Sequence, residues 1–257
     1  MSFNSYPFPS YDWQYQGFDY WGIANMSQFL ADEMYADGVR VVGRYLYPQQ
    51  YPNGKGISQA EAQMYLNAGI SMFFYYEVNT SDALGGYSRG QQNGQACLAE
   101  ATAIGVPLGT QIYCCCDTGV SDSDANGVVM DYLEGFMDAL PDYNTGIYGG
   151  SNVMQACYNN FPANLRCQAG AWGAQEFSPI DIRQWLINSN RQALNDNKIR
   201  IANITIDSQG YAYWRGNNVD LISTDSLTNM WGSGSPTPPT PPIEDTKMPI
   251  WFYLKPF

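Results

Sequence analysis

The chain has 257 residues, of which 45% are hydrophobic and 15% aromatic, a composition typical of a globular protein rather than a disordered one. Its 24 acidic and 12 basic residues give a net charge of −12, a field that opposes binding to nucleic acid. Histidine is absent, which excludes Ser-His and Cys-His nucleophile pairs, histidine zinc sites and histidine-ligated iron. Any chemistry must therefore depend on Asp, Glu, Tyr, Cys or Lys.

Residues 1–15 are predicted to form an aromatic N-terminal arm. Rings at six of these positions lie among prolines and serines, and so many exposed rings would be costly in water. We therefore expect the arm to pack on another surface. The N-terminus has no basic start followed by an apolar run, and no apolar run is long enough to span a membrane. Neither a secretory signal nor a transmembrane segment is expected.

Strand-like and helix-like segments alternate from residue 16 to residue 231. The predicted strands are Gln16–Tyr20, Val39–Tyr45, Ile70–Glu77, Ile112–Cys116, Thr145–Tyr148, Gln168–Trp172, Ile182–Trp185 and Ile201–Asp207. The predicted helices are Asn25–Ala36, Ser58–Gly69, Arg89–Ile104, Ala125–Leu140 and Asn152–Asn159. Such alternation implies a parallel sheet, and about eight units predict an α/β fold, a (β/α)₈ TIM-like barrel.

The strand that includes Cys114, Cys115 and Cys116 ends at an acidic residue, Asp117. A carboxylate at the C-terminal end of a buried parallel strand is where barrel enzymes place their chemistry. The alternative is that Asp117 caps the helix that follows it. Free cysteine behaves as a small buried hydrophobe, so the triplet suits a packed interior.

No C-x-x-C pair occurs among the six cysteines, which argues against a zinc ribbon or a thioredoxin-type site. Cys157 and Cys167 are close enough in sequence for a disulfide, but reduced thiols are favoured because no secretory signal is expected.

Four carboxyl groups at predicted strand ends are the candidate catalytic residues: Asp19, Glu77, Asp117 and Asp207. In a barrel these strand ends converge on one mouth, and cleavage of a glycosidic bond needs two carboxyl groups. The alternative is that the acids form salt bridges with Arg44 and Arg183. The candidate substrate-binding residues near the same rim are Tyr45, Tyr76, Tyr148, Trp172 and Gln184. The alternative for the rings is that they fill the barrel core. No metal site and no cofactor is predicted.

Several motifs together resemble one known family. They are Gly17-Phe18-Asp19-Tyr20, Val42-Gly43-Arg44-Tyr45-Leu46, Lys55-Gly56-Ile57-Ser58 with Glu61, Tyr76-Glu77, Ile112-Tyr113 with Asp117, Gly146-Ile147-Tyr148-Gly149, Gln168 with Ala171-Trp172, and Arg183-Gln184-Trp185. In this order they resemble the glycoside-hydrolase-like domain of unknown function found in actinobacteria and their phages. That family is a relative of the family-25 muramidases, and the resemblance covers about residues 16–215.

The resemblance implies a TIM-like barrel whose mouth carries the four acids named above. In the muramidases the fourth strand carries an Asp-x-Glu pair, whereas this chain has Asp117-Thr118-Gly119 and lacks the second acid. Glu77 or Asp19 would have to replace it for catalysis to be retained.

The end of the chain suggests a role in an assembly. Residues 232–242 form a Gly/Ser/Pro linker that is stiff in its proline half, and residues 243–257 form an aromatic peptide too short to bury a core. We expect this peptide and the N-terminal arm to dock onto neighbouring proteins of an oligomeric assembly.

The function expected from these features is that of a phage virion protein, a minor tail component, whose barrel binds or cleaves cell-envelope glycan. Its location would be the phage tail, after assembly in the host cytoplasm. The alternatives are a soluble muramidase of the endolysin type and a purely structural barrel without catalysis.

Overall fold

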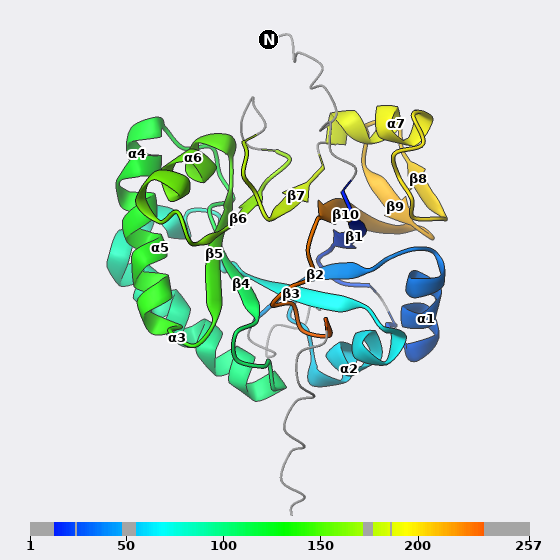
Figure 1. The fold of residues 1–257 in the computed structure, drawn as a ribbon, viewed down its shortest axis with the longest axis horizontal. Helices are drawn as coiled ribbons and strands as arrows, with labels where there is room; N and C mark the ends of the chain where they lie inside the picture. The colour runs from blue at the N-terminus through cyan, green and yellow to red at the C-terminus, as the bar shows by residue number, and fades with distance from the viewer. Residues whose placement is uncertain (1–12, 24, 48–54, 172–176, 186, 234–257) are drawn as a thin grey trace, which may run out of the picture.

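The protein was analysed as a computed structural model, which describes residues 13–23, 25–47, 55–171, 177–185 and 187–233. Eight strands close into a barrel at its centre (Figure 1). In their order around the barrel they are β1 (Tyr15–Asp19), β2 (Val41–Tyr45), β3 (Ser71–Tyr76), β4 (Gln111–Cys115), β5 (Asn144–Gly149), β6 (Leu165–Gln168), β7 (Ile182–Gln184) and β10 (Asn217–Thr224).

The barrel is of mixed orientation. Strands β1 to β7 are parallel to one another, while β10 is antiparallel to both of its neighbours, β1 and β7. The predicted TIM-like barrel is thus confirmed, but the expectation that all eight strands are parallel is wrong. The physical reason is that β10 follows a short hairpin rather than a crossover helix, so the chain re-enters the barrel in the opposite direction.

Helices cover the outside of the barrel and connect the early strands (Figure 1). They are α1 (Gln28–Ala36), α2 (Gln59–Ala68), α3 (Gly86–Ile104), α4 (Asp122–Asn126), α5 (Val128–Ala139), α6 (Ser151–Asn160) and α7 (Ile187–Asn195), with a 3₁₀ turn η1 (Asp82–Gly85) before α3. The predicted helix Ser58–Gly69 corresponds to α2: the Ser58 side chain caps it by accepting from Glu61 N, and Gly69 ends it in the left-handed region. No helix among the described residues is long and apolar enough to cross a membrane.

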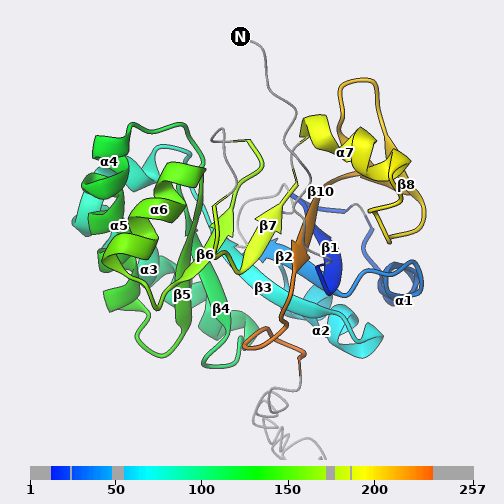
Figure 2. The same cartoon turned by 45° about the horizontal axis from the view of Figure 1, so that its top comes forward.

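The predicted closing strand Ile201–Asp207 lies outside the barrel. Its centre forms β8 (Ile204–Ile206), which pairs only with β9 (Ala212–Trp214), and β9 in turn pairs with the first residues of β10. The two-residue connection Arg215-Gly216 has φ values of 48° and 86°, as expected for a tight hairpin turn. Figure 2 shows this hairpin and α7 together on the side of the barrel where α1 lies.

Side chains alternate between the barrel interior and the helical layer, as the pleat of a strand requires. In β3, Phe73 and Tyr75 belong to the interior cluster, whereas Phe74 and Tyr76 pack against the helices. In β4 the same alternation places Cys115 inside, away from Cys114 and Cys116. All six cysteines are buried free thiols, Cys157 and Cys167 among them.

The segment after β10 covers the end of the barrel opposite to the strand C-termini. Gln111 N, at the start of β4, donates to Asn229 O at 2.8 Å, and the backbones of Trp231 and Met72 exchange two hydrogen bonds. Residues 1–12, most of the predicted aromatic arm, lie outside the described residues, as does everything from 234 onward; Tyr15 is the first residue of β1.

Candidate active site

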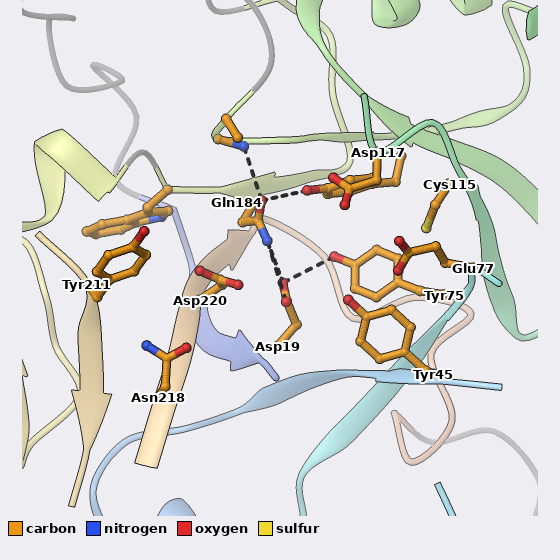
Figure 3. Close-up of a pocket in the computed structure, with 14 residues that line it drawn as sticks. Asp19, Tyr45, Tyr75, Glu77, Cys115, Asp117, Gln184, Tyr211, Asn218 and Asp220 are labelled. Atoms are coloured by element: carbon orange, nitrogen blue, oxygen red, sulfur yellow. Dashed lines mark hydrogen bonds between the residues drawn. The ribbon is translucent and has the colours of Figure 1, made fainter. Parts of the chain in front are cut away.

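A pocket of about 290 Å³ opens at the C-terminal ends of the parallel strands (Figure 3). Its walls come from six of the parallel strands (β1 to β5 and β7), from the segment after β6, from β10 and from the turn before β9. The lining residues are Asp19, Tyr45, Tyr75, Glu77, Cys115, Asp117, Tyr148, Gly170, Ala171, Gln184, Trp185, Tyr211, Asn218 and Asp220.

Three of the four predicted catalytic acids lie together in this pocket. Asp19 is the last residue of β1, and Glu77 follows β3 directly. Asp117 is the second residue after the end of β4. Parallel strands bring these chain positions to one rim although they are far apart in sequence. The predicted binding residues Tyr45, Tyr148 and Gln184 line the same pocket, whereas Trp172 lies outside the described residues.

Two predicted site residues lie elsewhere. Asp207 follows β8, which is not a barrel strand, and its carboxylate accepts hydrogen bonds from the backbone of its own turn. Tyr76 points into the helical layer, where its ring packs at 6.2 Å from that of Phe136. Its neighbour Tyr75 lines the pocket instead, because a shift of one residue along a strand reverses the face.

Asp220 is a pocket acid that the sequence reading missed. It lies in the first half of β10, whereas the four predicted acids stand at the C-terminal ends of predicted strands. Because β10 is antiparallel, its N-terminal half is the part that reaches the mouth. Gly216 between two short alternating segments was the available signal, since a glycine in a two-residue connection favours a hairpin and hence an antiparallel strand.

Asp19 and Asp220 face each other across the β1–β10 pair. They are direct register partners, and their side chains therefore point to the same face of the sheet. Gly43 on β2 makes room beside them: a Cβ at Gly43 would lie 2.8 Å from the Asp19 Cβ. Two carboxylates this close cannot both ionise easily.

Burial and like charge raise the pKa values of this pair. Burial is the largest cause for Asp19, followed by the charge of Asp220, and the pKa of Asp19 lies well above its ordinary value. Burial, and then the charge of Asp117, raise the pKa of Asp220 to about 6. Asp19 is 2% exposed, whereas Asp220 is only partly buried. Asp220 is therefore the member of the pair that can present a proton to a bound molecule near neutral pH.

Gln184 holds Asp19 in place from β7. Its amide nitrogen Nε2 donates to both Asp19 carboxylate oxygens, at 3.3 and 3.5 Å. Its oxygen Oε1 accepts from Tyr148 Oη at 2.9 Å and from Gly170 N at 3.2 Å. Tyr75 Oη adds a further donor to Asp19 at 3.4 Å. The carboxyl group of Asp19 is thus fixed from two sides (Figure 3).

Glu77 has a cationic partner. Lys55 Nζ lies 2.9 Å from Glu77 Oε2, and the lysine is 3% exposed. The ammonium group also lies 4.7 Å from the centre of the Tyr45 ring and 4.6 Å from that of Trp21. The ion pair with Lys55 holds the Glu77 side chain in place at the pocket.

The salt-bridge partners anticipated for the acids are engaged with other residues. Arg44 Nε lies 2.8 Å from Glu61 Oε1, on the outer side of the barrel. Arg183 Nη1 donates to Gln168 Oε1 at 3.1 Å. Among the described residues, no group of three or more Cys, Asp or Glu side chains is arranged to hold a metal ion.

A closed β/α barrel with four carboxyl groups gathered at its mouth defines the class of glycoside-hydrolase-like barrel domains. The sequence profile of the Rv2525c-like, glycoside hydrolase-like domain matches residues 32–220. The chain therefore belongs to the Rv2525c-like, glycoside hydrolase-like family.

Two crystal structures of the Tat-secreted protein Rv2525c from Mycobacterium tuberculosis, one in complex with HEPES and one with L-tartrate, share this fold. They are 20% and 19% identical to this chain, cover 84% of it and 98% of their own length, and superpose with a TM-score of 0.62. An uncharacterized protein from B. stearothermophilus is 15% identical over 84% of this chain and 100% of its own, with a TM-score of 0.55. No curated protein sequence matches the chain.

Proposed function

We propose that the pocket binds a glycan of the cell envelope and hydrolyses one of its glycosidic bonds. The observation that carries the proposal is that Asp220, with a pKa of about 6, lies in the same pocket as Asp117. Glycosidic cleavage needs one carboxyl group that holds a proton and one that is ionised. The membership of the chain in a glycoside hydrolase-like family agrees with this chemistry.

In this proposal Asp220 acts as the general acid. Its carboxyl proton is transferred to the glycosidic oxygen as the bond between that oxygen and the anomeric carbon breaks. Asp117 acts from the other side. Either it attacks the anomeric carbon and forms a glycosyl ester that water then hydrolyses, or it takes a proton from the water that attacks this carbon. Asp19 shares the proton of the pair and orients Asp220, while Lys55 keeps Glu77 as a fixed acceptor for sugar hydroxyl groups.

The charges of the pocket favour an uncharged sugar. Asp19, Glu77, Asp117 and Asp220 contribute four carboxyl groups to the lining, and Lys55 is the cation paired with one of them. The whole chain carries a net charge of −12, which adds repulsion toward anionic polymers. Neutral N-acetylhexosamine or hexose chains are therefore preferred over glycans rich in carboxylate or phosphate.

Binding without cleavage is the second candidate. The observation in its favour is Gly119, which stands where the related muramidases carry the second acid of an Asp-x-Glu pair. In this case the pocket would recognise the glycan through the same aromatic and carboxylate groups but leave the bond intact.

Release of reducing ends from purified peptidoglycan, arabinogalactan and chitin oligosaccharides tests the proposal. We expect wild-type activity to fall above about pH 6, as Asp220 loses its proton. Asp117→Asn and Asp220→Asn should each lower the rate by roughly 10² or more, as is usual for loss of an acid or base. Asp131→Asn, at an exposed position on α5, serves as the control. A wild type that binds these glycans but cleaves none would establish the binding role instead.

We propose further that the barrel acts as part of a phage tail. The support comes from the sequence: the proline-containing linker of residues 232–242 and the aromatic peptide of residues 243–257 suit attachment to neighbouring virion proteins. In this setting the protein would be assembled in the host cytoplasm, and the barrel would meet the envelope glycan when the particle contacts a cell.

A further inference from the structure

One wall of the pocket comes from outside the eight-stranded barrel. The hairpin formed by β8 and β9 extends the sheet beyond β10, and the turn that enters β9 carries Tyr211. Tyr211 lines the pocket and is 38% exposed. Figure 3 shows its ring on the same side of the pocket as Asn218 and Asp220, opposite Tyr45.

The strand register explains why Tyr211 faces the pocket. On β9 and β10, Trp214 pairs with Asn217, Tyr213 with Asn218 and Ala212 with Val219. The next position in this series places Tyr211 opposite Asp220. Residues opposite each other on neighbouring strands point to the same face, so Tyr211 continues the row that contains Asp220 and Asp19.

Asp207 fixes the turn that carries Tyr211. Its Oδ1 accepts from Gln209 N at 2.9 Å and from Tyr211 N at 3.0 Å, while its own amide donates to Tyr211 O at 3.0 Å. Desolvation acts in the opposite direction, but these amide donors lower the pKa of Asp207. From α7, Asn190 Nδ2 donates to Gly210 O at 3.1 Å. The turn is therefore held on both sides.

The other pocket tyrosines have their ring faces occupied. The Tyr75 ring packs edge-on against that of Tyr148 at 5.4 Å and lies 5.5 Å from that of Tyr45. Tyr75 is 2% and Tyr148 8% exposed. The buried rings of Tyr75 and Tyr148 form the floor of the pocket, whereas Tyr211 presents ring surface to whatever enters it.

We propose that Tyr211 is a stacking platform for an uncharged sugar ring, adjacent to the bond that Asp220 would protonate. The inference rests on the proposed glycan function and adds a specific subsite to it. The apolar face of a sugar ring would cover the exposed ring of Tyr211, while Asn218, two residues before Asp220 on the same face of β10, supplies an amide for a hydroxyl group. Asp207 is the positioning residue of this subsite.

Calorimetric titration of the full chain with a thio-linked tetramer of N-acetylglucosamine, which resists hydrolysis, tests the subsite. We expect Tyr211→Ala to weaken binding about tenfold, because the covered apolar area is lost. Tyr211→Phe should stay within about twofold of wild type, since it keeps the ring face. Phe29→Ala removes a ring that is 67% exposed on α1, away from the pocket lining, and serves as the control.

Asp207 variants test the positioning role separately from stability. Asp207→Ala removes the acceptor of the turn and should weaken binding of the tetramer as much as Tyr211→Ala does. Asp207→Asn keeps one acceptor oxygen and should bind the tetramer nearly as tightly as wild type. Melting temperatures recorded in parallel separate a moved ring from an unfolded hairpin. If both Asp207 variants lose the same affinity for the tetramer, Asp207 does not position Tyr211.

The outcomes separate the subsite from the function on which it rests. If wild type binds the tetramer and Tyr211→Ala binds it equally well, the subsite is wrong and the proposed function stands. If Tyr211→Phe loses as much affinity for the tetramer as Tyr211→Ala, the hydroxyl group rather than the ring face makes the contact, and the stacking role is wrong. A wild type that neither binds the tetramer nor cleaves any envelope glycan would overturn both proposals.

Discussion

Asp19 and Asp220 illustrate how burial and like charge raise the pKa values of carboxyl groups at the mouth of a barrel. The two residues lie opposite each other in antiparallel register, in a place where burial already disfavours charge. Gln184 and Tyr75 donate to Asp19 but do not remove the repulsion between the carboxylates. The pKa of Asp19 is therefore raised by burial and by the charge of Asp220, whereas Lys55 offsets the charge of Glu77.

The raised pKa values of this pair predict that its contribution to the free energy of unfolding falls as pH rises. An unfolded Asp titrates near 3.9, whereas folded Asp220 titrates near 6, so the folded state binds more protons between these values. The stabilisation is present below about pH 4 and is lost as pH rises through about 6. Asp220→Asn should therefore be more stable than wild type by about 1–3 kcal/mol at pH 7.5, with little difference at pH 4.

Urea unfolding at pH 4.0, 5.0, 6.0 and 7.5 measures this difference. Asp131→Asn, at an exposed carboxyl on α5, should show no such dependence on pH. A gap between wild type and Asp220→Asn that is the same at every pH would mean that the aspartate pair holds no additional proton.

At the scale of elements, α3 and α5 pack closely against each other on the outside of the barrel. Three glycines let the two helices approach each other. A Cβ at Gly90 would lie 2.1 Å from Tyr132 O, and one at Gly94 would lie 2.8 Å from Phe136 O. At Gly135 it would lie 2.1 Å from Tyr87 O. The contacts are with backbone atoms, so no side-chain rotation can relieve them.

Gly135→Ala is therefore expected to destabilise the protein. In an isolated helix the change would stabilise by up to about 1 kcal/mol, because alanine has the higher helix propensity. Here the clash with the α3 backbone should dominate and give a net loss of about 2 kcal/mol or more. Chemical denaturation compares the variant with Ser88→Ala, an exposed site on α3 that should be nearly neutral. A Gly135→Ala variant as stable as wild type would show that the helices can separate at little cost.

At the scale of the whole molecule, residues that follow β10 cover the end of the barrel opposite the pocket. Met230 belongs to the interior cluster, and Trp231 pairs with Met72 near the start of β3. The last 15 residues, which include Ile250, Trp251 and Phe252, are apolar enough to need a partner surface. We propose that this partner surface belongs to a neighbouring protein, because the linker of residues 232–242 lets the peptide reach beyond its own barrel.

Deletion of residues 243–257 should leave a folded, soluble barrel that no longer enters particles. Circular dichroism and gel filtration measure the first part, and detection of the protein in purified virions measures the second. Should the shortened chain unfold or precipitate while the surviving fraction still assembles, the peptide belongs to the barrel and the docking role is wrong.

The sequence by itself determined the α/β class, the barrel, the positions of most strands and three of the pocket acids. It could do so because these features depend on local patterns: apolar runs, a capping serine before Glu61, and acids at the ends of parallel strands. Position at or near the end of a strand also predicted three of the pocket's binding residues, Tyr45, Tyr148 and Gln184.

Only the tertiary structure decided which strand closes the barrel, and with it the fourth acid. Asp207 and Asp220 are both acids in strand-like segments, and local pattern does not say which segment pairs with β1. The pairing of Asp19 with Asp220, the ion pair of Glu77 with Lys55 and the position of Tyr211 at the pocket join residues that are distant in sequence. Such contacts follow from the direction and register of strands, which long-range packing determines.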